Sequence, residues 1–254
     1  MSATSLDATV FAARARQLLE WLVREQLPAI RRGGQLLADV IGREGVVHCF
    51  GTGHSRAIGM ELAGRAGGLV PVNLIAIKDL VLHGGEPPAY ALDPESERNP
   101  EVARRLWRLH RIRPEDCLVL ISNSGRNATT VEMGALARRE GLPVVAITSL
   151  QHSHRVTSTH PSGKRLFEIA DVVIDNGAPY GDALIEVPGG GRICAASTLT
   201  GVVIAQMMVA EAAGILVARG QEVPALISLN VPDSRARNDA LRARYAGRVL
   251  QSEP

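Results

Sequence analysis

Apolar residues recur at intervals of three or four along the first part of the chain, from residue 9 to about residue 42. Examples are Leu18, Leu19, Leu22 and Val23, then Leu36, Leu37 and Val40. This spacing predicts amphipathic helix. Pro28 interrupts the region, and its ring disfavours helical backbone for the residue before it. We therefore expect two N-terminal helices that meet near Pro28.

Beyond this region, short apolar runs rich in β-branched residues alternate with segments of helical spacing. The runs lie at 46–50, 69–77, 117–122, 143–149 and 170–176, and the helical segments at about 55–66, 99–110, 127–140 and 193–218. Strands that are apolar throughout belong to a sheet covered on both faces. Their alternation with helices is typical of parallel topology. The sequence thus predicts an α/β protein with a single doubly wound, mainly parallel five-stranded sheet, preceded by the two helices.

The composition fits one globular domain and excludes several classes of function. Of the 254 residues, 46% are hydrophobic and 21% charged, which suffices for one large core. Only 3% are aromatic and the net charge is +2, so we expect no nucleic-acid binding. We see neither a signal peptide nor a stretch of about 18 apolar residues able to span a bilayer. We expect a cytoplasmic protein without a membrane partner.

The cysteines and most of the histidines give no metal signature. The cysteines are Cys49, Cys117 and Cys194, and the histidines of the irregular segment 150–164 are His152, His154 and His160. The cysteines are far apart and odd in number, which indicates reduced thiols. A metal site would favour a carboxylate beside the histidines, and none lies close to them in the sequence. We expect no obligatory metal and no cofactor.

A polar segment after the third apolar run is the strongest local signal of a ligand site. It has the sequence LISNSGRNATT, from Leu120 to Thr130, and it opens a helix. Ser122, Ser124 and Asn127 can donate hydrogen bonds there, and a helix N-terminus attracts anions. The alternative is that Ser124 or Asn127 only caps the helix. Spacing leaves both possibilities open.

A second polar turn, from Gly51 to Arg56, follows the first apolar run and opens another helix. Turns at the carboxyl ends of strands can face one crevice, where open α/β sheets bind ligands. The dinucleotide-binding glycine pattern and the Walker pattern are both absent. The paired turns therefore favour a different anionic ligand.

The segment ISNSGRNATTVEMGALARREGLPVVAITS, from Ile121 to Ser149, resembles the phosphosugar-binding signature of the sugar isomerase (SIS) domain. With FGTGHS before it, the resemblance covers roughly residues 46 to 215. The whole chain is similar to a little-characterised bacterial SIS family whose members are often labelled phosphoheptose isomerases. We accordingly expect packing helices at 1–45, an SIS domain at 46–220 and a C-terminal extension at 221–254.

The resemblance implies a binding site and an assembly. The residues that it places around the phosphate of a sugar are Gly53, Ser55, Ser122, Asn123, Ser124, Gly125 and Asn127. It also implies a homodimer or homotetramer with the sugar near a subunit interface. The apolar residues of 199–216 suit helix packing across such an interface, although a buried intramolecular helix has the same pattern.

An aldose–ketose isomerisation needs a group that moves a proton between neighbouring carbons. Glu61 is the first candidate, because its surroundings resemble a segment of phosphoheptose isomerases that holds a catalytic glutamate, although its spacing from Ser55 is about one helical turn shorter. Those enzymes also carry a histidine in the late helix, and residues 195–214 contain none. His83 and His54 are the possible substitutes, since histidine titrates near neutral pH. Each of the three side chains is alternatively a solvated surface group.

Three functions remain open. The leading hypothesis is a sugar-phosphate isomerase that uses general acid–base catalysis. The absent late-helix histidine motivates a second, a non-catalytic phosphosugar sensor or adaptor. A third is a lyase that acts on an amino-sugar phosphate ether, as in another branch of the SIS family.

Overall fold

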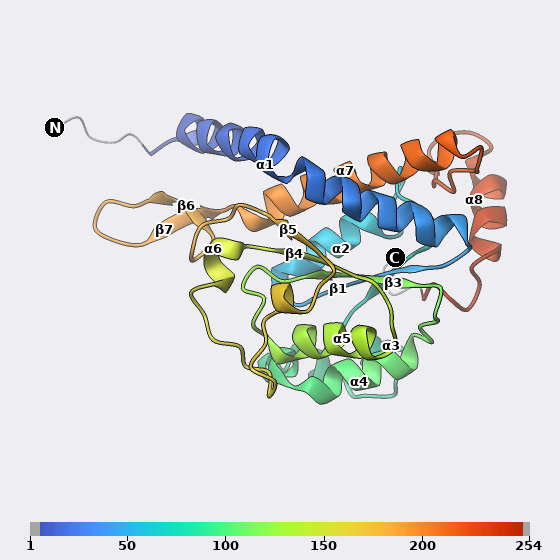
Figure 1. The fold of residues 1–254 in the computed structure, drawn as a ribbon, viewed down its shortest axis with the longest axis horizontal. Coiled ribbons are helices and arrows are strands. Elements are labelled where there is room, and N and C mark those ends of the chain that lie inside the picture. The colour runs from blue at the N-terminus through green and yellow to red at the C-terminus, as the bar shows by residue number, and fades with distance from the viewer. Residues whose placement is uncertain (1–5, 251–254) are drawn as a thin grey trace.

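Five parallel strands in the order β2-β1-β3-β4-β5 form the centre of the molecule (Figure 1). The computed structural model describes residues 6–250. The strands are β1 (Val47–Gly51), β2 (Val72–Ile75), β3 (Cys117–Ile121), β4 (Val144–Thr148) and β5 (Val172–Asp175). Each lies within or beside one of the apolar runs, so the predicted fold class and all the predicted strands are confirmed.

Helices cover both faces of this sheet (Figure 1). One face carries α1 (Ala8–Gly42), α2 (Arg56–Leu62) and α7 (Ser197–Ala218), and the other carries α3 (Asp79–Leu82), α4 (Pro100–Leu109) and α5 (Ala128–Arg139). Side chains of one strand alternate between the two cores, as Val119 and Leu120 do. The short helices are η1 (Gly53–Ser55), η2 (Pro88–Leu92), η3 (Pro94–Arg98), α6 (Leu150–Ser153) and η4 (Leu166–Glu168).

The N-terminal region is one helix, which corrects the prediction of two. α1 begins after Asp7, whose carboxylate accepts hydrogen bonds from the amides of Thr9 and Val10, and it continues through Pro28. Proline removes only one hydrogen bond of the helix. Residues on both sides of it, such as Leu22 and Leu37, are buried in the same core, and this packing outweighs the local preference.

The last long helix begins later than predicted. Residues 192–195 form β7 (Arg192–Ala195), which pairs in antiparallel fashion with β6 (Ala183–Glu186). α7 starts only at Ser197, where the carboxylate of Asp182 accepts hydrogen bonds from the Ala196 and Ser197 amides. In Figure 1 this hairpin projects beyond the body at the same end as the start of α1.

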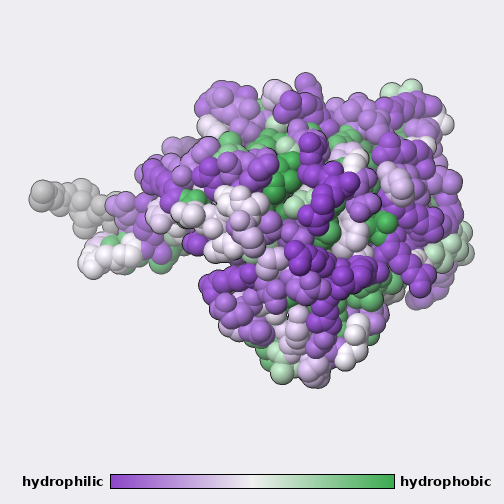
Figure 2. Space-filling view, turned by 60° about the horizontal axis from the view of Figure 1, so that its bottom comes forward, coloured by the Kyte–Doolittle hydropathy of each residue, from purple (hydrophilic) through white to green (hydrophobic). Residues whose placement is uncertain are grey.

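α7 also corrects the expectation that no stretch could span a bilayer. It is long and apolar enough by composition, with a mean hydropathy of 1.9 over its most apolar window. It nevertheless packs between α1 and α2, and Ile204, Met208 and Ala212 lie in the core of the sheet. The face of the molecule in Figure 2 is mostly hydrophilic, with small apolar areas between polar ones. One face of α7 is therefore part of the core of this α/β fold, and 39% of its most apolar window is buried.

The C-terminal segment closes the amino edge of the sheet. It contains α8 (Ser234–Ala243), which contributes Leu241 to a small core with Val70. Beyond it, Arg248 Nη2 lies 2.5 Å from Asp116 Oδ1, and the Leu250 amide donates to Asn73 Oδ1 at 2.9 Å.

The two side chains that receive this tail belong to a buried polar network. Asp116 and Asn73 are both fully buried, and both contact His48 on β1, at 3.1 Å and 3.0 Å. Burial alone would raise the pKa of Asp116, but hydrogen bonds from His48 and from the amides of Val46 and Arg113 lower it to about 2. The carboxylate is thus charged and fully bonded inside the protein.

Candidate functional site

The two polar turns lie side by side at the carboxyl edge of the sheet. β1 and β3 are neighbouring parallel strands, and Gly51 is paired with Ile121 at their ends. The chain leaves β1 toward α2 on one face of the sheet and leaves β3 toward α5 on the other. Such a divergence between adjacent strands is the topological switch point, where open α/β sheets bind ligands.

The first turn runs from β1 through η1 into α2. Gly53 has φ +54 and nothing near its missing side chain, so glycine is required there by the left-handed backbone. His54 is exposed and Ser55 is partly buried. Thr52 Oγ1 donates a hydrogen bond to Glu97 Oε2 at 2.8 Å, which brings a carboxylate from η3 to this turn.

The second turn is fixed by its own side chains and by a close approach. The Gly125 amide donates to Ser122 Oγ at 3.1 Å, which closes the turn. Gly125 has φ +60, and a Cβ atom there would lie 2.9 Å from Ser153 Oγ and 3.2 Å from Thr148 Oγ1. Only glycine satisfies both the conformation and the space.

The backbone of the second turn has bonded carbonyl groups and unbonded amides. The Asn123 carbonyl accepts a hydrogen bond from the Ser149 amide (3.1 Å), and the Ser124 carbonyl accepts one from Ser153 Oγ (2.8 Å). The Gly125 carbonyl accepts from the Leu166 amide (2.8 Å), and the Arg126 carbonyl accepts from the Thr159 amide (3.0 Å). Within residues 6–250, no acceptor is seen for the amides of Asn123, Ser124, Arg126 and Asn127. Free amides beside a helix N-terminus form an anion site.

Asn127 occupies the N-cap position of α5, but its side chain makes no capping hydrogen bond. Thr159 Oγ1 accepts the hydrogen bond from the Ala128 amide instead, at 3.1 Å. The Ser124 side chain has no hydrogen-bond partner among the described residues either. The capping alternative therefore does not account for these two side chains.

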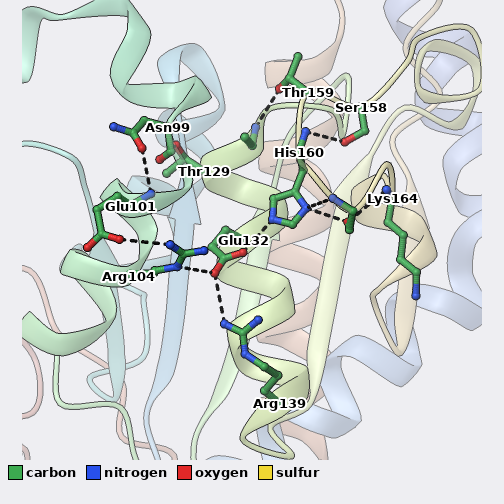
Figure 3. A network of polar contacts seen from close by, with 12 residues as sticks. Asn99, Glu101, Arg104, Thr129, Glu132, Arg139, Ser158, Thr159, His160 and Lys164 are labelled. Atoms are coloured by element: carbon green, nitrogen blue, oxygen red, sulfur yellow. Dashed lines mark hydrogen bonds and ion pairs between the residues drawn. The ribbon is translucent and has the colours of Figure 1, made fainter.

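A buried carboxylate ties the histidine-rich segment to α5 (Figure 3). Glu132, on α5, is 2% exposed, and its oxygens contact His160 Nε2 at 2.8 Å, Arg104 Nε at 2.9 Å and Arg139 Nη2 at 3.2 Å. Burial alone would raise the pKa of Glu132, but these hydrogen bonds outweigh it and hold the pKa below its ordinary value. His160 thereby holds the neighbouring Thr159 against the second turn.

The predicted catalytic residues lie in different places. Glu61 is in the last turn of α2, 19% exposed, where its carboxylate pairs with Arg65 and accepts a hydrogen bond from Gln206 Nε2 on α7 at 2.6 Å. His83 is exposed and directly follows α3, eight residues after the end of the edge strand β2. Of the three, only His54 lies within one of the two turns.

Among residues 6–250, no group of three metal-binding side chains is found. The histidines of the segment 150–164 have other neighbours: the rings of His152 and Tyr180 are 5.0 Å apart, and those of His154 and Phe167 are 4.7 Å apart. Cys49 and Cys117 are free and buried, and burial raises the pKa of both thiols.

A cavity of about 470 Å³ opens elsewhere, between α2, β2 and α8. Its walls include Met60, Val72 and Tyr245, and it contains none of the residues of the two turns.

Comparison with known proteins gives the chain its family. The family model of the SIS domain matches residues 10–149, from α1 to the end of β4, which is more than half of the 254 residues. The chain belongs to the SIS domain family. The resemblance found in the sequence is thereby confirmed, and the matched residues include part of α1.

This SIS protein has curated relatives that match it over nearly its whole length. The UPF0309 protein BH3325 of Halalkalibacterium halodurans is 37% identical over 230 residues, which cover 90% of this chain and 93% of the relative. The UPF0309 protein Lm4b_02611 of Listeria monocytogenes serotype 4b is 38% identical over 234 residues, which cover 92% and 93%.

Solved SIS structures share the fold. The phosphoheptose isomerase GmhA of Neisseria gonorrhoeae has a TM-score of 0.51 at 15% identity, covering 79% of this chain and 93% of that one. A phosphoheptose isomerase of Francisella tularensis has a TM-score of 0.55 at 15% identity, covering 80% and 95%. At this identity the likeness concerns the fold.

Sequence reasoning missed Glu97 and Glu132. Glu97 lies in an irregular polar stretch, and its link to Thr52 spans 45 positions. Glu132 lies in a helix with arginines nearby and has the pattern of a solvated residue, but His160, 28 positions away, helps to bury it. Neither contact has a local signature in the sequence.

Proposed function

We propose that this protein binds a phosphorylated sugar at the β1–β3 switch point and interconverts its aldose and ketose forms. The observation that carries the proposal is the second turn, with its four unbonded amides and the free Ser124 hydroxyl at the start of α5. A phosphate group is a compact anion that matches such donors. The sugar then extends toward the first turn.

The residues proposed to bind the phosphate contribute two kinds of donor, side chains and backbone amides. Ser124 and Asn127 offer side chains, Asn123 offers its amide, and Ser122 can still donate its own hydroxyl while it accepts from Gly125. Gly53 and Ser55 belong to the first turn, which lies beside the second where β1 and β3 end. This arrangement supports binding by hydrogen bonds from neutral groups.

A thermal-shift panel of C5–C7 sugar phosphates and amino-sugar phosphates tests the binding, because a ligand that binds only the folded protein raises its Tm. Ser124→Ala should reduce the shift. Ser228→Ala, in the C-terminal segment, is the matched control and should leave it unchanged. The absence of any shift with wild-type protein would contradict the proposal.

Turnover distinguishes the three functions. An isomerase exchanges a substrate C–H with deuterated water and equilibrates aldose with ketose. Binding without exchange would favour a phosphosugar sensor. The lack of a histidine in α7 supports that alternative. Release of a carboxylic acid from an amino-sugar phosphate ether would favour the lyase.

We also propose that the protein acts in the cytoplasm. We further propose that two or more copies of the chain associate through the outer face of α7. Beyond its first turn α7 is apolar apart from Gln206 and Glu211, yet Ala210 and Gly214 are exposed, next to Leu27 of α1. A helix that is apolar all round is normally covered. Analytical ultracentrifugation should show a dimer or tetramer that Ala210→Arg dissociates, whereas the exposed control Ala243→Arg on α8 should not. A wild-type monomer would contradict the association.

A further inference from the structure

We infer that Glu97 is the catalytic carboxylate that carries the proton, an assignment that rests on the isomerase function proposed above. Glu97 Oε2 accepts the hydrogen bond from Thr52 Oγ1 at 2.8 Å, and Thr52 directly precedes Gly53 in the first turn. Within residues 6–250, it is the only carboxylate seen to hydrogen-bond to residues 51–55 or 122–127. The switch point therefore has one acidic side chain held at its edge.

The segment that bears Glu97 is fixed on both sides. Thr129 Oγ1, in the first turn of α5, donates to the carbonyls of Ser96 at 2.7 Å and Asn99 at 2.9 Å. Figure 3 shows Thr129 and Asn99 close together where α5 and α4 begin. The Asp93 carboxylate caps η3 by accepting from the Glu95 amide at 2.9 Å. Glu97 is thus held between the first turn and the helix that the second turn opens.

The position of Glu61 suits the role less well. Its Oε1 atom is engaged by both Gln206 and Arg65, at the end of α2 that lies farthest from the first turn. A general base needs a lone pair within hydrogen-bonding reach of the substrate. Glu97 keeps Oε1 unbonded and has no basic partner among the described residues, while Oε2 is oriented by Thr52.

The chemical step needs no other reactant. The Glu97 carboxylate takes the proton from C2 of the aldose phosphate, and the electron pair of that C–H bond forms the C1–C2 double bond as the carbonyl oxygen takes up negative charge. The resulting enediolate transfers its O2 proton to O1. The protonated side chain of Glu97 then returns its proton to C1 as the carbonyl forms at C2. Thr52 is a positioning residue in this scheme.

Three glutamine variants test the assignment: Glu97→Gln, Glu61→Gln and the matched control Glu95→Gln. Glu95 lies in the same turn, is exposed and pairs with Arg98. Each variant is assayed for its thermal shift with the C5–C7 aldose phosphates and, by NMR, for deuterium incorporation from deuterated water. Glu97→Gln should keep the ligand-induced shift and lose about 10²–10⁴-fold in exchange rate, the usual range for a general base. Glu95→Gln should exchange as wild type does.

The outcomes separate the two proposals. If wild type exchanges and Glu97→Gln does so at an equal rate, or if only Glu61→Gln loses exchange, the assignment of Glu97 is wrong and the isomerase function stands. If wild type binds a sugar phosphate but exchanges nothing, the isomerase function fails and the role of Glu97 with it. Should Glu97→Gln not fold, as judged by its melting curve, Glu97→Asp retains the charge with a shorter reach and should lose exchange but not binding.

Discussion

The imidazole of His160 and the carboxylate of Glu132 join the segment after α6 to α5, with Nε2 and Oε2 2.8 Å apart. Both side chains are buried, at 8% and 2% exposed. The contact places Thr159 where its amide bonds the Arg126 carbonyl and its hydroxyl bonds the Ala128 amide. A pair of residues outside the second turn thus helps to determine which backbone groups of that turn are free.

His160→Ala should therefore weaken ligand binding without removing a ligand group. Loss of the contact frees the segment, and we expect the affinity for the sugar phosphate with the largest thermal shift to fall about tenfold, or roughly 1.4 kcal/mol. Isothermal titration calorimetry measures the change. His154→Ala is the control, because His154 is exposed on the same segment. Equal affinities of the two variants would show that the contact does not support the turn.

Gly125→Ala should both destabilise the protein and abolish binding. An alanine with left-handed backbone costs about 1–2 kcal/mol by itself. At position 125 it also meets Ser153 Oγ at 2.9 Å, whereas at Gly141, with φ +72, nothing lies within 4 Å. Gly141→Ala is thus the control for backbone strain alone, and we expect it to keep the ligand-induced thermal shift. Urea denaturation of both variants measures the stability; equal losses would argue against the close approach.

The stability of the protein should fall in acid through Asp116. Its folded pKa of about 2 is below its ordinary value of 3.8. A depressed pKa contributes stability that is complete above pH 3.8 and is lost as the pH falls toward 2, here about 2 kcal/mol. In Asp116→Asn this part of the pH dependence should disappear, and the variant should be less stable at pH 7. Urea denaturation between pH 2.5 and pH 7 tests both statements; an unchanged slope in the variant would refute them.

Pro28→Ala should stabilise the protein. The substitution restores an amide that can donate to the Arg24 carbonyl within the continuous helix α1, and Pro28 is exposed, so no packing is lost. We expect the free energy of unfolding to rise by about 1–3 kcal/mol. Pro114→Ala, in an exposed turn before β3, should bring no such gain. A loss of stability in Pro28→Ala would mean that the proline shapes α1 to fit the sheet.

The strands were predictable because four of them are buried on both sides and β5 is only partly exposed on one, which leaves mainly apolar runs. Where tertiary packing overrides local preference, the prediction was wrong: Pro28 lies within a single helix because residues on both sides of it share one core. The β6–β7 hairpin was missed because Ile193 and Cys194 extend the apolar pattern of α7, although Gly189, Gly190 and Gly191 mark its turn.

At the candidate site, the two turns were predictable from the sequence, but the carboxylates that contact the turns or the segments beside them were not. Ser122, Gly125 and Asn127 have local signals, since polar residues and glycine follow an apolar strand. Glu97 and Glu132 have none, because their partners Thr52 and His160 are distant in the sequence. Local chemistry predicted the position of the candidate site, whereas the two carboxylates beside it are placed by pairings that only the fold creates.

The contacts of Arg248 and Leu250 with Asp116 and Asn73 also bear on how the chain matures during synthesis. During translation, β1 and β2 leave the ribosome long before the residues that complete the polar network between them. Until then Asn73 and Asp116 have unfilled hydrogen-bonding positions at the amino edge of the sheet. The nascent domain therefore cannot reach its final stability until its C-terminal segment has emerged and docked.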